Sequence, residues 1–333
     1  MKLGLDPENA IEITDSDNEC TEELWTMSYA IVAEGLTKKF GKFLAVDNIS
    51  FSVQEGEFFG LLGPNGAGKT TIIRMLTGVL KPEVGRIKID GVDLDKEPLI
   101  LKERMGVIPE VGTVYLDLTA RENLDLFGRY YGLPKKLRDE RGERLLRELG
   151  LYDRADSLVK NFSKGMRQRI SIGCAILHEP KVLLLDEPTE GLDVQSRRMI
   201  VEKVKGLNAK GSTIILTTHN IEEASRLCQR VCIIDKGRIV AIDSPEHLRS
   251  TLEKLQSVEV SFNRRVDPSL FSAQCISRVE EQGDKLKIFT SNPDEAIEKI
   301  MAVKKELVLN IVSLSTVGPT LEDVFVKLTE AHT

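Results

Sequence analysis

The chain has 333 residues and a formal net charge of −6, and 41% of its residues are hydrophobic, as in a globular protein long enough for two domains. No run approaches the eighteen apolar residues of a membrane-spanning helix, and no basic stretch followed by an apolar one suggests a secretory signal. Five irregularly spaced cysteines do not form a disulfide framework, so we expect a reduced, cytoplasmic protein.

The first 28 residues differ from the rest of the chain in charge. They contain eight acidic side chains against one lysine and few large apolar residues, so we expect residues 1–28 to form a disordered extension. Met27 is an alternative start, which would remove this segment. The remaining chain is close to neutral, and this argues against a nucleic-acid partner.

Residues 29–250 alternate between strand patterns and helical patterns, which predicts an α/β domain with a mixed, largely parallel sheet. The segment KVLLLDEP (181–188) has the apolar run of a central parallel strand that is buried on both faces. A stretch rich in Arg, Glu and Leu, from about residue 96 to 178, predicts a helical insertion. The other expected strands are 30–35, 48–53, 55–63, 86–90, 212–218, 230–235 and 238–242, and the other expected helices are 66–80, 194–209 and 220–228.

The pattern changes after about residue 250. Short strands that suit antiparallel pairing now dominate, together with two amphipathic helices, and this predicts a small accessory α+β domain over residues 251–333. The expected strands are 258–262, 277–282, 285–290 and 309–315, and the expected helices are 294–306 and 321–331.

The segment GPNGAGKT (63–70) follows an apolar strand and precedes a predicted helix. Its spacing is that of a phosphate-binding P-loop, in which glycines let backbone N–H groups surround the phosphates. Lys69 would reach the β- and γ-phosphate oxygens, and Thr70 would be a ligand of Mg²⁺. A plain glycine turn is the alternative, but the flanking strand and helix favour the P-loop.

Two carboxylates end the apolar strand LLLDEP (183–188). An unpaired Asp186 would be costly at the end of a buried strand, and a nearby Mg²⁺ ion would remove that cost. The adjacent Glu187 is placed to polarise an attacking water molecule. An acidic pair at an ordinary turn is the alternative, which the upstream P-loop makes less favourable.

The segment NFSKGMRQRIS (161–171) predicts a second anion site. Its apolar spacing indicates a helix that begins near Ser163, and a helix start with a hydroxyl and a glycine favours negative charge.

These motifs stand in the order found in nucleotide-binding subunits of ATP-binding cassette (ABC) transporters, P-loop ATPases that the chain resembles from about residue 30 to 250. The resemblance implies binding of ATP and Mg²⁺ and hydrolysis of ATP. It assigns Glu187 and His219, in TTHN, to catalysis, and Thr70, Asp186 and Glu110 to the metal. The residues that it assigns to ATP are Phe40 at the adenine, Gly63, Pro64, Asn65, Gly66, Ala67, Gly68, Lys69, Thr70 and Thr71 of the Walker A loop, Ser163, Lys164, Gly165 and Met166 of the signature, and Asp193 of the D-loop.

Three positions depart from the usual pattern of the family. Phe40 replaces the more common Tyr, which keeps the aromatic face and loses the hydroxyl. Glu110 occupies the lid-loop position that is normally Gln; a carboxylate is a better cation ligand but donates no hydrogen bond. The alternative for Glu110 is a solvated loop carboxylate. The signature reads FSKGM instead of LSGGQ, so Lys164 adds a positive charge at a helix start.

The end of the chain points to one branch of the family. PTLEDVFVKLT (319–329) and KGMRQR resemble the daunorubicin-resistance type of multidrug exporter. The apolar residues Leu321, Val324, Phe325 and Leu328 share one helix face, which we expect to pack within the C-terminal domain.

The resemblance also implies partners. In this family two cassettes pack head to tail, so the second subunit would be another copy of the chain or a related cassette. The ATPase would drive export through a separate transmembrane permease and would lie in the cytoplasm, on the inner face of the membrane. One alternative is a soluble cassette ATPase that acts on ribosomes or DNA, and another is a cassette that binds ATP without turnover. The sequence leaves open the exported substrate and whether the C-terminal domain stabilises or gates the dimer.

Overall fold

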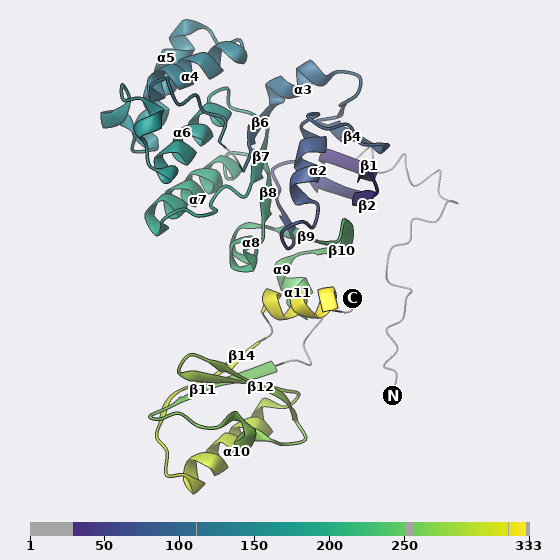
Figure 1. Cartoon of the computed structure of the whole chain (residues 1–333), viewed down its shortest axis with the longest axis vertical. Coiled ribbons are helices and arrows are strands. Elements are labelled where there is room, and N and C mark those ends of the chain that lie inside the picture. The colour runs from purple at the N-terminus through teal and green to yellow at the C-terminus, as the bar shows by residue number, and fades with distance from the viewer. Residues whose placement is uncertain (1–28, 111, 251–255, 319, 331–333) are drawn as a thin grey trace.

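The computed structural model describes residues 29–110, 112–250, 256–318 and 320–330. The predicted disordered extension (1–28) lies outside these residues. Residues 29–250 form one large body, and residues 256–318 form a smaller one at the far end of the molecule (Figure 1). Within the described ranges, no helix combines the length and the apolar character needed to cross a bilayer.

The N-terminal body begins with an antiparallel sheet whose strand order is β2-β1-β4-β5. Its first two strands form a long hairpin, and Phe40 pairs with Phe43 at the tip. The predicted strands 30–35 and 48–53 are therefore parts of longer strands. The bounds are β1 (Tyr29–Phe40), β2 (Phe43–Gln54), β4 (Val84–Ile89) and β5 (Val92–Asp93).

The central sheet has six strands in the order β10-β9-β3-β8-β7-β6. All neighbours are parallel except β9 and β10, so the predicted mixed, largely parallel sheet is confirmed. Every residue of β3, β7 and β8 is buried, because layers cover both faces of the sheet. The bounds are β3 (Phe58–Leu62), β6 (Met105–Ile108), β7 (Val182–Asp186), β8 (Thr213–Thr218), β9 (Arg230–Asp235) and β10 (Arg238–Asp243).

Alternate residues of the central strands face two separate cores. In β7, Val182 and Leu184 pack with α2 and the first sheet, whereas Leu183 and Leu185 pack with α6 and α7. Helices α2 and α6 consequently lie on opposite sides of the central sheet (Figure 1). The bounds are α2 (Lys69–Leu76), α6 (Lys164–Ile176), α7 (Val194–Asn208), α8 (Ile221–Leu227) and α9 (Pro245–Ser250).

The segment from 96 to 178 is largely helical, as expected, but it also contains strand β6. This strand pairs with β7, so it belongs to the central sheet, and the helical insertion begins only after it. The helices of this segment are α3 (Pro98–Arg104), α4 (Ala120–Tyr130), α5 (Lys135–Glu148), the short 3₁₀ turns η2 (Tyr152–Arg154) and η3 (Val159–Asn161), and α6.

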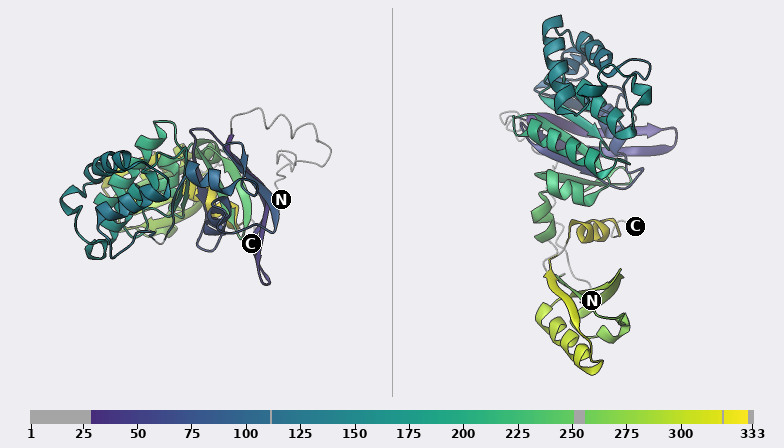
Figure 2. Two further views of the ribbon diagram at one scale, coloured as in Figure 1. Left: turned by 90° about the horizontal axis from the view of Figure 1, so that it is seen from above. Right: turned by 90° about the vertical axis from the view of Figure 1, so that its left-hand side faces the viewer.

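Residues 256–318 have their own sheet and core. The strand order is β12-β13-β11-β14, all antiparallel, and helix α10 packs against the sheet over a core that includes Val258, Ile288 and Ile300 (Figure 2). The bounds are β11 (Gln256–Phe262), η4 (Pro268–Phe271), β12 (Ile276–Gln282), β13 (Lys285–Thr290), α10 (Pro293–Glu306) and β14 (Ile311–Val317).

The final helix, α11 (Leu321–Glu330), does not pack where we expected. Leu321 and Val324 join the core of the N-terminal body, with Phe325 and Leu328 packed against it, so the prediction that this face packs within the C-terminal domain is wrong. Its contacts are with α8 and α9, and packing against them removes its apolar face from water.

Candidate active site

The P-loop sequence forms the turn between β3 and α2. Gly68 precedes the helix with a φ of 105°, and a Cβ atom there would lie 2.6 Å from the Ala45 carbonyl oxygen. The backbone therefore requires glycine at this position. The predicted helix 66–80 is shortened at both ends to Lys69–Leu76, because residues 66–68 belong to the turn and the chain leaves the helix before Gly78, whose φ is 69°. Free N–H groups of the first helical turn face this turn, an arrangement that binds anions.

Lys69 lies at the base of the turn, and its side chain is 6% exposed. The ammonium group donates hydrogen bonds to the carbonyl oxygens of Gly63, at 2.7 Å, and Pro64, at 3.2 Å. Its third neighbour is a Glu187 carboxylate oxygen at 3.3 Å. The lysine charge is therefore fixed beside the turn in which phosphates would lie.

An oxygen cluster lies at the end of β7. The buried Asp186 carboxylate accepts hydrogen bonds from the hydroxyl groups of Thr70, at 3.2 Å, and Thr217, at 2.6 Å. A carboxylate and a hydroxyl beside a phosphate turn are the donors that Mg²⁺ prefers, so these residues fit the ion.

Glu187 follows in a strained backbone conformation, with a φ of 48°. Its N–H donates to the Thr217 hydroxyl at 3.0 Å, which holds the backbone in place. The second carboxylate oxygen lies 3.1 Å from Nδ1 of His219. The two residues assigned to catalysis are thus in direct contact, and Glu187 also contacts Lys69.

A cleft of about 360 Å³ lies above the P-loop turn. The hairpin tip lines one side with Phe40 and Phe43, which are 49% and 63% exposed. Glu187 and Glu110 line the other parts of the cleft. A planar base could stack on either ring while its phosphates reach Lys69.

The predicted signature lies elsewhere. Ser163 caps α6, and its hydroxyl accepts a hydrogen bond from the Met166 N–H at 3.2 Å. Among the described residues that line the cleft, none comes from positions 163–166. A Cβ atom at Gly165 would lie 2.2 Å from the Ser196 hydroxyl oxygen, so α6 and α7 meet here at glycine distance.

Asp193 caps α7 next to the signature. The Ser196 backbone N–H and hydroxyl each donate to its carboxylate at 2.8 Å, and these bonds lower the pKa of Asp193. The Lys164 ammonium lies over Gly191, since a Cβ atom there would be 2.5 Å from it. The signature and D-loop residues therefore form a second cluster.

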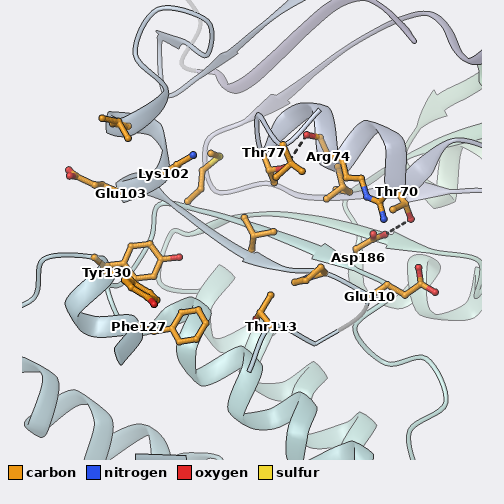
Figure 3. Close-up of a pocket in the computed structure, with 17 residues that line it drawn as sticks. Thr70, Arg74, Thr77, Lys102, Glu103, Glu110, Thr113, Phe127, Tyr130 and Asp186 are labelled. Atoms are coloured by element: carbon orange, nitrogen blue, oxygen red, sulfur yellow. Dashed lines mark hydrogen bonds between the residues drawn. The ribbon is translucent and has the colours of Figure 1, made fainter. Parts of the chain in front are cut away.

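A larger groove of about 750 Å³ runs between α2, α3, β6 and α4. Figure 3 shows Thr70, Asp186 and Glu110 toward one end and the aromatic side chains of Phe127 and Tyr130 toward the other. Glu110 lines both this groove and the smaller cleft, so it lies where the two spaces approach each other.

Comparison with known proteins places this geometry in a family. The family described as "ABC transporter" matches residues 46–190. The chain is 37% identical over 302 residues to a linearmycin resistance ATP-binding protein of Bacillus subtilis, which covers 89% of this chain and 97% of that protein. It is 38% identical over 296 residues to a Nod factor export ATP-binding protein of Ralstonia nicotianae, which covers 89% and 92%. The chain belongs to the ATP-binding proteins of ABC transporters.

Solved structures agree with this assignment. An ATP-binding subunit of an ABC transporter is 34% identical with a TM-score of 0.63, covering 67% of this chain and 93% of that one. An ATP-binding cassette in its ADP conformation is 27% identical with a TM-score of 0.59, covering 66% and 93%. We refer to residues 29–250 as the cassette from here on. The chain is thus an ATPase of this family that binds ATP.

The cassette brings together one part of the predicted site and separates another. Lys69, Asp186 and Glu187 converge with His219 at the carboxyl ends of β7 and β8, as expected for an open α/β sheet. The signature and Asp193 lie at the starts of α6 and α7, which pack on the face of the central sheet opposite α2. Thr217 and Phe43 also contribute to the site but were not predicted. Both lie in strands, and a strand pattern in the sequence gives no sign of a role at the site.

Proposed function

We propose that this cassette hydrolyses ATP with Mg²⁺ and drives export through a separate membrane permease. The observation that carries the proposal is the contact of Glu187 with both Lys69 and His219 beside the P-loop. Linearmycin resistance and Nod factor export, in the names of two relatives, support an exporter. The same names disfavour a soluble cassette on ribosomes or DNA.

The residues divide the chemistry between them. Lys69 and the N–H groups of the turn bind the β- and γ-phosphates, and an aromatic ring of the hairpin stacks on the adenine. Thr70, Asp186 and Glu110 would hold Mg²⁺, which would neutralise charge on the phosphate oxygens. Glu187 orients a water molecule and accepts its proton, and His219 contacts the γ-phosphate from the adjacent loop.

A second subunit would complete the site. Because Ser163 and Gly165 lie outside the cleft of their own chain, they are available to contact ATP held by another copy or by a related cassette. The exposed hydroxyl and the helix start of α6 suit a γ-phosphate. Lys164 adds positive charge near the same seam. We therefore assign the signature to a head-to-tail dimer that ATP closes.

The groove of about 750 Å³ suits the permease. Its walls expose Val79, Leu99 and Tyr130 at 77%, 74% and 64%, an apolar surface that a cytoplasmic segment of a membrane protein could cover. Glu110 connects this groove to the ATP cleft. We place the cassette in the cytoplasm, peripheral to the inner face of the membrane.

The test uses the Glu187→Gln variant, with Glu190→Gln as the matched control because Glu190 is an exposed carboxylate that lines the same cleft. Asn65→Cys and Asn161→Cys are introduced separately into Glu187→Gln chains, which are then mixed with ATP, Mg²⁺ and a short bismaleimide. We expect Asn65–Asn161 cross-links only in the mixture and only with ATP, no turnover by Glu187→Gln, and wild-type turnover by Glu190→Gln. Turnover by Glu187→Gln at the wild-type rate, or cross-linking independent of ATP, would disprove the proposal.

A further inference from the structure

Glu223 lies in the first turn of α8 and joins two loops of the active site. One carboxylate oxygen accepts a hydrogen bond from the Thr189 hydroxyl at 2.7 Å. The other accepts a hydrogen bond from the Thr218 hydroxyl at 2.9 Å. Both threonines are buried, at 8% and 1% exposure, so water competes little for these bonds.

The two threonines lie beside the residues assigned to catalysis. Thr189 follows Glu187 by two residues, and Thr218 immediately precedes His219. The Glu223 carboxylate therefore spans the loops that carry Glu187 and His219. Of the described residues that line the ATP cleft, Glu223 is not one, so it acts on the reaction only through its neighbours.

The loops need such a link because the backbone pairing between them ends here, with a last bond of 3.2 Å from the Glu187 N–H to the Thr217 carbonyl oxygen. The parallel ladder of β7 and β8 ends at the pair Asp186 and Thr217. Immediately beyond it, Glu187 has a φ of 48°, a conformation that persists only when the surroundings enforce it. The Thr217 hydroxyl holds the Glu187 N–H on one side. Glu223 holds the same loop two residues after Glu187, through its hydrogen bond with Thr189.

The cap of α8 fixes Glu223 in turn. Its N–H donates to the Asn220 side-chain oxygen at 3.0 Å, and the Asn220 N–H donates to the Thr218 hydroxyl at 3.0 Å. The Thr218 hydroxyl therefore accepts one bond and donates the other, so its orientation is determined. Two hydroxyl donors meet two oxygens of a side chain that only accepts, which suits a carboxylate better than an amide.

We propose that Glu223 is a positioning residue that sets the distance between Glu187 and His219. The inference rests on the proposed function, because it takes the roles of these two residues as given. It predicts that loss of the carboxylate slows hydrolysis while ATP binding persists, because Glu223 does not line the ATP cleft.

The experiment measures steady-state ATPase activity of the full chain at varied ATP concentration. For Glu223→Ala we expect kcat to fall at least tenfold while KM for ATP stays within about twofold. Glu223→Gln keeps one acceptor oxygen, so its kcat should be intermediate. Glu222→Ala is the matched control, because Glu222 is an exposed neighbour in the same helical turn and pairs only with Arg226 among the described residues. Its kcat should equal that of the wild type.

A nearly isosteric variant keeps the test meaningful if Glu223→Ala folds poorly. Thr189→Val removes one hydrogen bond to the carboxylate and should lower kcat with the same constancy of KM. The double variant Thr189→Val/Glu223→Ala should be no slower than Glu223→Ala alone, since both changes break one link. Wild-type kcat for Glu223→Ala and Thr189→Val, with an inactive Glu187→Gln, would overturn this inference and leave the proposed function intact. Wild-type turnover by Glu187→Gln would instead remove the proposed function.

Discussion

Lys69 and Glu187 form an ion pair at the centre of the active site, with 3.3 Å between the ammonium nitrogen and a carboxylate oxygen. Their side chains are 6% and 9% exposed, so neither charge is well hydrated. The carboxylate is thus the partner of the ammonium group before a phosphate replaces it. Nucleotide binding would release Glu187 from Lys69 at the moment when it is needed to orient water.

The first prediction concerns the stability of this pair. Glu187→Gln leaves the Lys69 charge buried beside two carbonyl oxygens, which should lower the free energy of unfolding by about 1–3 kcal/mol without nucleotide. ATP should then raise the melting temperature more in the variant than in the wild type, because phosphate restores the missing counter-charge. Thermal unfolding with and without ATP measures both effects. Glu190→Gln is the control and should match the wild type; an equal ATP shift in all three proteins would contradict the prediction.

The second prediction separates the two aromatic residues of the hairpin tip. The resemblance assigns the adenine to Phe40, and Phe43 is the second exposed ring on the same cleft. Phe40→Ala should weaken ATP binding roughly tenfold through loss of stacking, whereas Phe40→Tyr keeps the ring face and should bind as the wild type does. Phe43→Ala is the matched comparison and should change affinity less than twofold. Titration with a fluorescent ATP analogue measures these affinities. A larger loss of affinity in Phe43→Ala than in Phe40→Ala would assign the adenine to Phe43.

The third prediction concerns Glu110, the carboxylate between the groove and the cleft. If it is a ligand of Mg²⁺, Glu110→Gln should raise the Mg²⁺ concentration for half-maximal ATPase activity a few-fold, because one negative charge near the ion is lost. Glu103→Gln, which changes a carboxylate of the same groove at the opposite end from Asp186, is the control (Figure 3). An unchanged Mg²⁺ dependence in Glu110→Gln would assign Glu110 to solvent rather than to the metal.

Most of the site can be predicted from the sequence, because its charged residues stand where the apolar pattern predicts burial. Asp186 ends a run of apolar residues, and a buried carboxylate needs a partner, so its role is visible without coordinates. Glu223 is different, because a glutamate in the first turn of a helix is ordinarily a favourable charge beside the helix dipole. Its partners, Thr189 and Thr218, come from segments 34 and five residues away, and only the fold brings them together.

The prediction for α11 was wrong for a related reason. The spacing of Leu321 and Val324 identifies an apolar face but does not identify the surface that it covers. Proximity in sequence suggested the C-terminal domain, whereas the helix packs against α8 and α9 of the cassette. The helix also has an ionic contact with the C-terminal domain, where the buried Lys287 of β13 lies 3.4 Å from Asp323 of α11.

The last prediction follows from a half-buried histidine that lies between α6 and β6. The His178 ring stacks on Tyr131, with 3.6 Å between ring centroids, and its Nε2 lies 3.1 Å from the Met105 carbonyl oxygen. A carbonyl oxygen only accepts, so Nε2 carries the proton of the neutral ring. Burial lowers the pKa of His178 from 6.5 to about 4; the bond to Met105 opposes this shift, and the charge of Arg141 adds to it.

Because the pKa is lowered on folding, the unfolded chain takes up a proton at His178 before the folded chain does. The free energy of unfolding should therefore decrease as the pH falls from about 6.5 to about 4, by about 3 kcal/mol over the whole interval, and this contribution should level off below it. His178→Gln retains a donor for Met105 and removes the titrating group. Urea unfolding between pH 8 and pH 4.5 should show a shallower decrease for the variant, although loss of the stacking on Tyr131 lowers its stability at every pH. Parallel curves for the two proteins would mean that His178 is protonated equally in the folded and unfolded chains, and that the stack tolerates the charge.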